Sequence, residues 1–258
     1  MGEPTRYEAT GGVATIVMDV PQRRNAFSQE LLTALMADLD RAAGDDAVRV
    51  IVLTNTGNTF SAGADLREDR AALGPHALSF VDLVHAIDAS SKPVVARMAG
   101  HAAGGAVAVV VACDLAVAAD TARVGITEVR LGIAPPPVAA LLAQRMTSRA
   151  LSEAFLVGEM MPASRAAELG MVNLVVPEDE VDGAVARFVD GLVRGGPTAL
   201  ATTKRALQDM ALLPLERAEQ LAREAPAEEA ARVEAREGVD AFLEKRPASW
   251  VPTSHEPA

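Results

Sequence analysis

A glutamate in apolar surroundings is the residue of this sequence best suited to moving a proton. Glu128 follows the stretch VGIT at 124–127 and precedes VRLGI at 129–133. Because burial disfavours the charged form of a carboxyl group, we expect a raised pKa, which suits an acid–base catalyst near neutral pH. A structural role fits these residues equally well: Glu128 could begin a helix capped by Thr127, or pair with Arg130.

Two glycine-containing segments could bind a developing negative charge. One spans residues 58–66 and the other 98–106, and each directly follows an expected strand. The second also leads into a helix, so its peptide N–H groups near Gly105 would point outward at the positive end of the helix dipole. Together the segments could place two N–H donors around one oxygen, as in an oxyanion hole. Alternatively, the glycines only permit tight turns.

Other kinds of chemistry have weaker support. His101 could act as a base, but a single histidine in a turn is more often structural, and Cys113 lies within an apolar stretch where packing is the simpler role. The four histidines show no ligand spacing, so no metal is expected. Neither a G-x-G-x-x-G fingerprint nor a phosphate-binding G-x-x-x-x-G-K-[ST] motif occurs.

Composition narrows the class of protein further. The chain has 258 residues, a net charge of −11 and 50% hydrophobic residues, which excludes a disordered chain and argues against a broad nucleic-acid-binding surface, which would need a basic face. It does not exclude a small basic site for a phosphorylated ligand. The start of the chain carries charge and no apolar core, so no signal peptide is expected. The longest apolar run, 102–113, is too short to span a bilayer. We therefore expect a soluble cytoplasmic protein.

Alternating strands and helices are expected to position these residues. Short β-branched or alternating runs predict strands at 6–10, 13–20, 48–54, 93–98 and 115–118. Helical spacing predicts a helix that begins after Ser28 and ends near Gly44, another at 77–89, and a third after Gly104. Strands and helices that alternate at this spacing indicate stacked βαβ units in an α/β core.

After Pro177 the sequence predicts helices and no further β-rich segment. Residues 178–193 and 198–212 are expected to be helical, as is 216–243 with one break at Pro226. We predict an α/β core at 1–195 and a helical oligomerisation region at 196–258. The latter has few large apolar residues, so its apolar stripe needs a partner surface.

The motifs taken together resemble the crotonase superfamily, the enoyl-CoA hydratase/isomerase group. They are FSAGADL at 60–66, GHAAGG at 100–105, ACD at 112–114, GITE at 125–128, LGIAP at 131–135 and AFLEKR at 241–246. Their order and spacing are more specific than any one of them, and the resemblance covers nearly the whole chain. It implies repeated ββα units with two roughly perpendicular sheets, followed by a helical region that forms homotrimers, often paired into hexamers.

The resemblance also assigns roles to individual residues. It implies that the N–H groups of Ala64 and Gly105 hold a thioester oxygen and that Glu128 is the catalytic carboxylate. Residues that match the coenzyme A-binding positions are Ala62, Ala64, Asp65, Leu66 and Gly105, with Phe242 and Lys245 reaching a neighbouring subunit's coenzyme A. No cofactor is expected, because the coenzyme A thioester is the substrate.

One departure from the family affects the expected reaction. Two-carboxylate hydratases have a second glutamate at the position of Ala108. We expect an enoyl-CoA hydratase-type lyase that adds water to a 2-enoyl-CoA. The alternatives are a Δ3,Δ2-enoyl-CoA isomerase that uses Glu128 alone, and an acyl-CoA-binding relative with little turnover.

Overall fold

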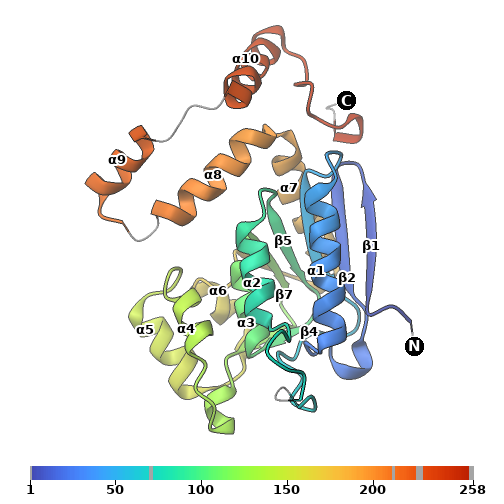
Figure 1. The fold of residues 1–258 in the computed structure, drawn as a ribbon, viewed down its shortest axis with the longest axis vertical. Coiled ribbons are helices and arrows are strands. Elements are labelled where there is room, and N and C mark those ends of the chain that lie inside the picture. Colours follow the sequence, from blue (N-terminus) through green and yellow to red (C-terminus); the bar gives the residue numbers. More distant parts are fainter. Residues whose placement is uncertain (1, 70–71, 211–212, 225–228, 256–258) are drawn as a thin grey trace.

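A six-stranded sheet runs through the centre of the computed structural model, which describes residues 2–69, 72–210, 213–224 and 229–255 (Figure 1). In order across the sheet its strands are β1 (Thr5–Thr10), β2 (Val13–Met18), β3 (Val50–Asn55), β5 (Val94–Met98), β7 (Leu115–Ala119) and β10 (Leu174–Val176). The β1–β2 pair is an antiparallel hairpin and the other neighbours are parallel. Every residue of β3 is buried, as expected where helices cover both faces of a sheet.

A smaller sheet lies at the ends of these strands. It contains β4 (Thr59–Ser61), β6 (His101–Ala103), β8 (Arg123–Gly125) and β9 (Met161–Pro162), in that order. β4 and β6 lie within the two glycine-containing segments, and the sequence pattern predicts no strand at any of these four places. Strands of two or three residues are too short to show an alternation of apolar and polar side chains, so periodicity cannot reveal them.

The two sheets arise from repeated ββα units, as the resemblance implied. β1 and β2 precede α1 (Gln29–Gly44), β3 and β4 precede α2 (Phe80–Ala89), and β5 and β6 precede α3 (Gly105–Ala112). β7 and β8 lead into the 3₁₀ helix η2 (Glu128–Leu131) and α4 (Pro136–Leu142). The Ser28 cap is confirmed, because its hydroxyl accepts the N–H of Leu31 at 3.2 Å.

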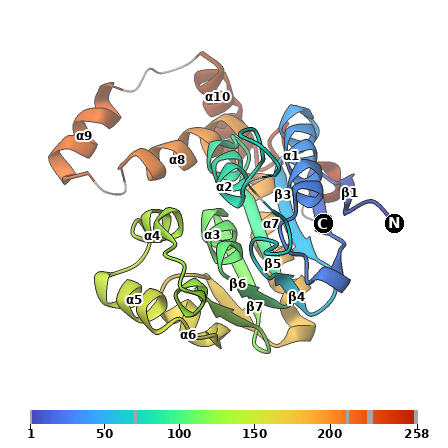
Figure 2. The same ribbon diagram turned by 60° about the horizontal axis from the view of Figure 1, so that its bottom comes forward.

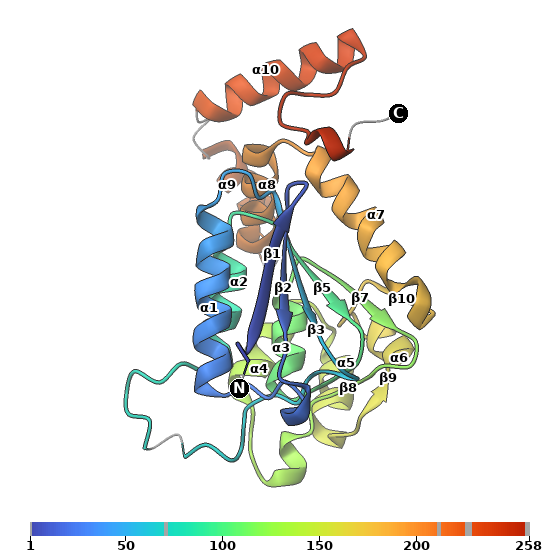
Figure 3. The same ribbon diagram turned by 90° about the vertical axis from the view of Figure 1, so that its right-hand side faces the viewer.

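Helices cover both faces of the large sheet (Figure 3). α1 and α2 lie on one face, and α7 (Val181–Arg194) lies on the other, where it contacts β5 and β7. Its buried side chains Val181, Val185, Val189 and Val193 recur every four residues. The remaining short elements are η1 (Pro21–Arg23), α5 (Ser148–Ser152), the π-helix η3 (Glu153–Val157), α6 (Ala163–Glu168), η4 (Glu178–Glu180) and η5 (Thr253–His255).

The end of the chain is helical, as predicted. α8 (Pro197–Met210), α9 (Leu215–Glu224) and α10 (Glu229–Glu244) extend beyond the sheet (Figures 1 and 2). The predicted break at Pro226 and the predicted helix end at Leu212 lie outside the described residues. The division of the chain at residues 195 and 196 stays a prediction.

A buried lysine attaches α8 to the core. The Lys204 ammonium lies 2.9 Å from a carboxylate oxygen of Asp114 and donates to the carbonyl oxygens of Ile87 at 3.0 Å and Lys92 at 3.3 Å. Asp114 also accepts the N–H of Val94 at the start of β5. The ion pair therefore joins α8 to the end of α3, and the hydrogen bond to Ile87 joins it to the end of α2.

α10 is attached to α8 through a helix cap. The Glu234 carboxylate accepts the N–H groups of Thr198 and Ala199, both at 2.8 Å, in the first turn of α8. A carboxylate at that end satisfies unpaired N–H groups and complements the helix dipole. After α10 the chain returns to the core: the Trp250 indole N–H donates to the carbonyl of Arg194, and Arg49 donates to the carbonyl of Trp250.

Candidate functional site

The small sheet brings the two glycine-containing segments together. β4 and β6 are parallel neighbours, so the residues that follow them meet. A methyl group on Gly63 would come within 3.2 Å of the Gly105 nitrogen and 2.7 Å of the Ala103 carbonyl oxygen, and Gly63 has a φ of +84°. Only glycine allows this close approach at such a backbone conformation.

Two N–H groups at this junction are available to a ligand. Ala64 follows Gly63, and Gly105 is the first residue of α3. Within the described parts of the chain, neither N–H donates to any acceptor. α3 is buried along its whole length, so the positive end of its dipole faces this junction in low-dielectric surroundings. Such an arrangement can stabilise an oxyanion.

The Glu128 carboxyl group lies beside the same junction. A methyl group on Gly104, whose φ is +58°, would meet Glu128 Oε1 at 2.9 Å. Glu128 Oε2 is buried and has no hydrogen-bond partner among the described residues. Burial raises the pKa of Glu128 above its ordinary value, and a backbone hydrogen bond opposes the shift. A carboxyl group held in this way can take up and return a proton near neutral pH.

In the described part of the chain, Glu128 is neither capped by the Thr127 side chain nor paired with Arg130. Glu128 is the first residue of η2, but the Thr127 side chain makes no capping hydrogen bond. Arg130 instead pairs with Glu159, with Nη2 and Oε1 2.7 Å apart. A buried carboxylate oxygen without a partner is costly in a folded protein, and such groups are common where a ligand binds.

The position of the missing second glutamate is apolar. Ala108 is buried and lies about one helical turn after Gly104 in α3. No charged group in the described part of the chain contributes to the pKa shift of Glu128. Ala108 supplies no carboxylate, and Glu128 is the carboxyl group that the contact with Gly104 places at the junction.

Phe80 is a residue at this site that the sequence analysis missed. A methyl group on Gly105 would lie 2.7 Å from the Phe80 ring, so the ring packs on the backbone next to the available N–H. Phe80 begins α2, whose start is fixed by a capping box between Ser79 and Asp82. This hydrogen bonding to Ser79 lowers the pKa of Asp82. The S-x-x-D spacing is the signal that could have placed the helix start here instead of at residue 77.

The expected coenzyme A-binding residues at 62–66 contact the turn that contains Arg23 and Arg24. The N–H of Ala62 donates to the carbonyl of Arg24 at 3.0 Å, and Asp65 lies 3.9 Å from the Arg23 guanidinium. Asp65 is buried, whereas Leu66 is exposed. Arg23 and Arg24 were not singled out by the sequence analysis, yet their exposed side chains make a small positive region beside this stretch. Charged groups of this kind suit phosphate.

The remaining expected binding residues lie elsewhere. Phe242 is in α10, and Lys245 follows that helix with a φ of +55°. α10 lies at the top of Figure 1, whereas the segment that leads into α4 lies at the bottom. The structure therefore does not bring Phe242 and Lys245 to the Glu128 site of the same chain, and their role at a neighbouring subunit stays a prediction.

His101 and Cys113 have structural roles. The Nδ1 atom of His101 accepts the N–H of Arg123 at 3.0 Å. Cys113 is buried, donates to the Val109 carbonyl, and has its pKa raised to about 12 by burial. In the described part of the chain, no group of three or more His, Cys, Asp or Glu residues could hold a metal ion. No helix there is long and apolar enough to cross a membrane.

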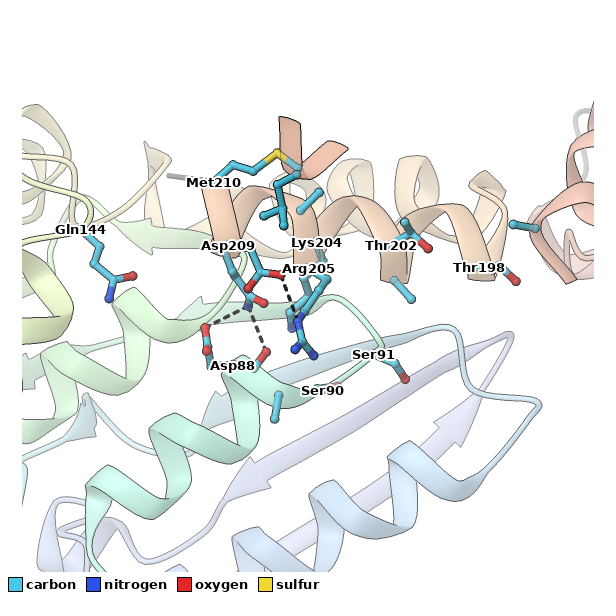
Figure 4. A pocket seen from close by; sticks show the side chains of 16 residues that line it. Asp88, Ser90, Ser91, Gln144, Thr198, Thr202, Lys204, Arg205, Asp209 and Met210 are labelled. Atoms are coloured by element: carbon cyan, nitrogen blue, oxygen red, sulfur yellow. Dashed lines mark hydrogen bonds and ion pairs between the residues drawn. The ribbon is translucent and has the colours of Figure 1, made fainter. Parts of the chain in front are cut away.

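A separate cavity of about 1070 Å³ lies between the end of α2 and α8 (Figure 4). Polar and charged side chains line it, including Lys204 and Gln208, which donates to Asp88 at 2.9 Å. None of Ala64, Gly105 and Glu128 lines this cavity. It belongs to the attachment of α8, not to the candidate active site.

Comparisons with known proteins agree with the fold. The sequence profile of the enoyl-CoA hydratase/isomerase family matches residues 8–252, and the chain belongs to that family. A Thermus thermophilus protein assigned as an enoyl-CoA hydratase is 35% identical over 244 residues, 92% of this chain and 96% of its own. The 2,3-dehydroadipyl-CoA hydratase of Escherichia coli is 32% identical over 239 residues, 91% of this chain and 93% of its own. The crystal structure of an enoyl-CoA hydratase/isomerase from Marinobacter aquaeolei superposes with a TM-score of 0.86 at 26% identity, covering 97% of this chain and all of that one.

Proposed function

We propose that this protein is an enoyl-CoA hydratase-type lyase that adds water to a 2-enoyl-CoA. The observation that carries the proposal is the Glu128 carboxyl group beside Gly104, with a buried Oε2 that has no hydrogen-bond partner among the described residues, one residue before the available N–H of Gly105. A base and an oxyanion donor at one junction are what proton transfer next to a thioester carbonyl requires.

The reaction follows from these groups. Glu128 removes a proton from water as the water oxygen bonds to C3 of the enoyl group. The electron pair of the C2–C3 double bond moves toward the carbonyl, and the N–H groups of Ala64 and Gly105 stabilise the resulting enolate oxygen. Glu128 then returns the proton to C2. Ala62, Asp65 and Leu66 would contact the coenzyme A moiety, and Arg23 and Arg24 offer charge for its phosphates.

Ala108 favours a second candidate, a Δ3,Δ2-enoyl-CoA isomerase. Moving a proton between C2 and C4 needs one carboxylate, which Glu128 can supply, and Ala108 adds none. Hydration additionally requires water to be held in place, and the family position that would supply a second carboxylate is a buried methyl group.

Two assays on purified protein distinguish the candidates. The protein is supplied with 2-enoyl-CoA in one and 3-enoyl-CoA in the other, and absorbance of the conjugated enoyl thioester is followed. Loss of absorbance in the first supports hydration, and its appearance in the second supports isomerisation. No change in either, with acyl-CoA still bound, would contradict both and leave a binding protein.

A further inference from the structure

Two consecutive residues before α1 have a left-handed backbone. Arg24 has a φ of +53° and Asn25 has a φ of +49°. Elsewhere in the described parts of the chain, Lys245 is the non-glycine residue with a positive φ. This conformation is costly for a residue with a Cβ, although asparagine tolerates it better than most, and it persists only where the surrounding contacts fix it. Such strain is concentrated in segments whose position matters to function.

The Asn25 side chain supplies contacts that fix this turn. Asn25 is fully buried, and its Oδ1 atom accepts the N–H of Val20 at 2.9 Å. Its amide nitrogen donates to the carbonyl oxygens of Thr56 at 3.1 Å and Thr59 at 2.8 Å. Val20 lies before η1, Thr56 lies between β3 and β4, and Thr59 begins β4. One buried side chain therefore ties the strained turn to the start of β4.

The chain that follows Asn25 pairs with the segment that contains Ala64. Phe27 and Ala64 form a parallel bridge, in which the Phe27 N–H donates to the Gly63 carbonyl at 2.8 Å and the Asp65 N–H donates to the Phe27 carbonyl at 3.3 Å. A residue between two neighbours bonded in this way directs its own N–H and C=O to the opposite side. The Ala64 N–H therefore points away from Phe27 and stays available to a ligand.

The pairing extends on both sides of this bridge. The Ala62 N–H donates to the Arg24 carbonyl at 3.0 Å, and the Glu68 carboxylate accepts the Gln29 N–H at 2.9 Å. The direction of the Ala64 N–H is therefore set by the position of the segment that the buried amide anchors. A donor must be held within a fraction of an ångström to stabilise charge on a reacting oxygen.

We infer that Asn25 is a positioning residue for the oxyanion donor at Ala64: its amide holds the strained turn, and the turn aims the N–H at the thioester oxygen. The inference rests on the proposed function for the thioester, but it gives Asn25 no proton transfer and no contact with the substrate. It also explains an asparagine where glycine would relieve the backbone, because glycine cannot make the three side-chain hydrogen bonds.

Infrared spectroscopy of a bound, unreactive thioester tests this without turnover. The ligand is butanoyl-CoA that carries an isotope label at the carbonyl carbon, and its C=O stretching frequency falls when the oxygen accepts hydrogen bonds. The unchanged protein should lower this frequency relative to free ligand. Asn25→Gly permits the same φ but removes the amide, so most of the lowering should be lost. Turnover of enoyl-CoA should fall about ten- to a hundredfold, with KM changed by less than about threefold.

Asn173→Ala is the control for a purely structural effect. The Asn173 Oδ1 atom accepts the N–H of Ala116 at 2.8 Å, near the start of β7, whereas the candidate site lies at the opposite end of α3. This variant should have a lower Tm but an unchanged carbonyl frequency and unchanged turnover per folded molecule. The inference is overturned if folded Asn25→Gly keeps the original frequency, or if its turnover falls only with the fraction of folded protein.

Asn25→Asp provides a second test that does not depend on how well the glycine variant folds. Aspartate keeps the size and the Oδ1 acceptor, but its ionised form sets a second oxygen against the carbonyl oxygens of Thr56 and Thr59. Protonation restores one donor. Its bound-ligand frequency should therefore exceed that of the unchanged protein at neutral pH, and the difference should shrink as the pH is lowered. Equal frequencies at neutral pH would contradict the inference.

The two proposals fail in different ways. A frequency lowered by the unchanged protein and restored in Asn25→Gly, without turnover of either enoyl-CoA, retains the inference and rejects the enzyme. A lowering that Asn25→Gly leaves intact, with turnover present, rejects the inference alone. No lowering in the unchanged protein rejects the oxyanion donors, and with them both proposals.

Discussion

We expect Glu128 to act as an acid or base and not as a structural residue, and one substitution separates the two roles. Glu128→Gln keeps the shape of the side chain but cannot exchange a proton at neutral pH, so turnover should fall by at least about a hundredfold. Affinity for acyl-CoA should change little, because the N–H donors are untouched. Turnover, affinity and Tm would be measured on one preparation. Full activity in the variant would end the proposal.

The pH dependence of stability gives an independent check on Glu128. Its pKa is raised in the folded chain, so the folded state holds the proton more tightly than the unfolded state does. That contribution is present below the ordinary value of 4.5 and is lost as the pH rises through the raised pKa. At neutral pH, Glu128→Gln should therefore have an unchanged or higher Tm, and a structural carboxylate would give a lower one.

The N–H of Gly105 can be tested with two matched substitutions. Gly105→Ala and Gly105→Pro both place a carbon against the Phe80 ring, but only proline removes the N–H. Because Gly105 is the first residue of α3, proline is compatible with the helix. Gly105→Pro should have a turnover about a hundred- to a thousandfold below that of Gly105→Ala. Equal turnover in the two folded variants would show that this N–H does not hold the oxyanion.

The site was predictable in its parts but not in its assembly. Glycine-rich segments after strands indicated the donors, and the apolar sequence around Glu128 indicated a raised pKa. The contact of that carboxyl group with Gly104 depends on where the small sheet places η2, which no local pattern contains. Phe80 could not be placed over Gly105 either, because that requires both the start of α2 and its packing on α3.

At the scale of elements, the attachment of α8 depends on Lys204. Lys204→Met would leave Asp114 without its partner, and removing one member of a buried pair costs about 3 kcal/mol. The neighbouring Arg205→Met is the control, because its pair with Asp209 is exposed and worth less than about 1 kcal/mol. Urea unfolding would measure both. The prediction is wrong if the two variants lose similar stability, and Asp114→Asn added to Lys204→Met should recover part of the loss.

Which elements the sequence could predict depended on their length. The long strands and α1 were predicted within a few residues, because their side chains repeat with a period of two or of 3.6. The strands of the small sheet were not predicted, since each contributes only two or three residues and is stabilised by pairing with its neighbours. Those short strands carry the candidate site, so the least predictable part of the fold is also the functional part.

The whole molecule is expected to assemble through its C-terminal helices. Leu207, Val233 and Phe242 are exposed in the single chain, Phe242 at 81%. Leu200 and Leu221 are already partly covered, and Leu212 lies outside the described residues. Covering such side chains favours association, so sedimentation equilibrium at micromolar concentration should give a trimer or hexamer. A monomer would refute this and would leave Phe242 and Lys245 without a ligand to reach.

The return of the chain after α10 gives the protein a built-in optical probe. Trp250 is its single tryptophan, and the indole lies between the end of α7 at Arg194 and the side of α10 at Gly238. Tryptophan fluorescence, excited at the red edge of the indole absorption band, therefore reports on the packing of the C-terminal helices against the core and not on the sheet. Separation of those helices from the core, by dilution or by heat, would shift the emission maximum before the far-ultraviolet circular dichroism of the sheet changes.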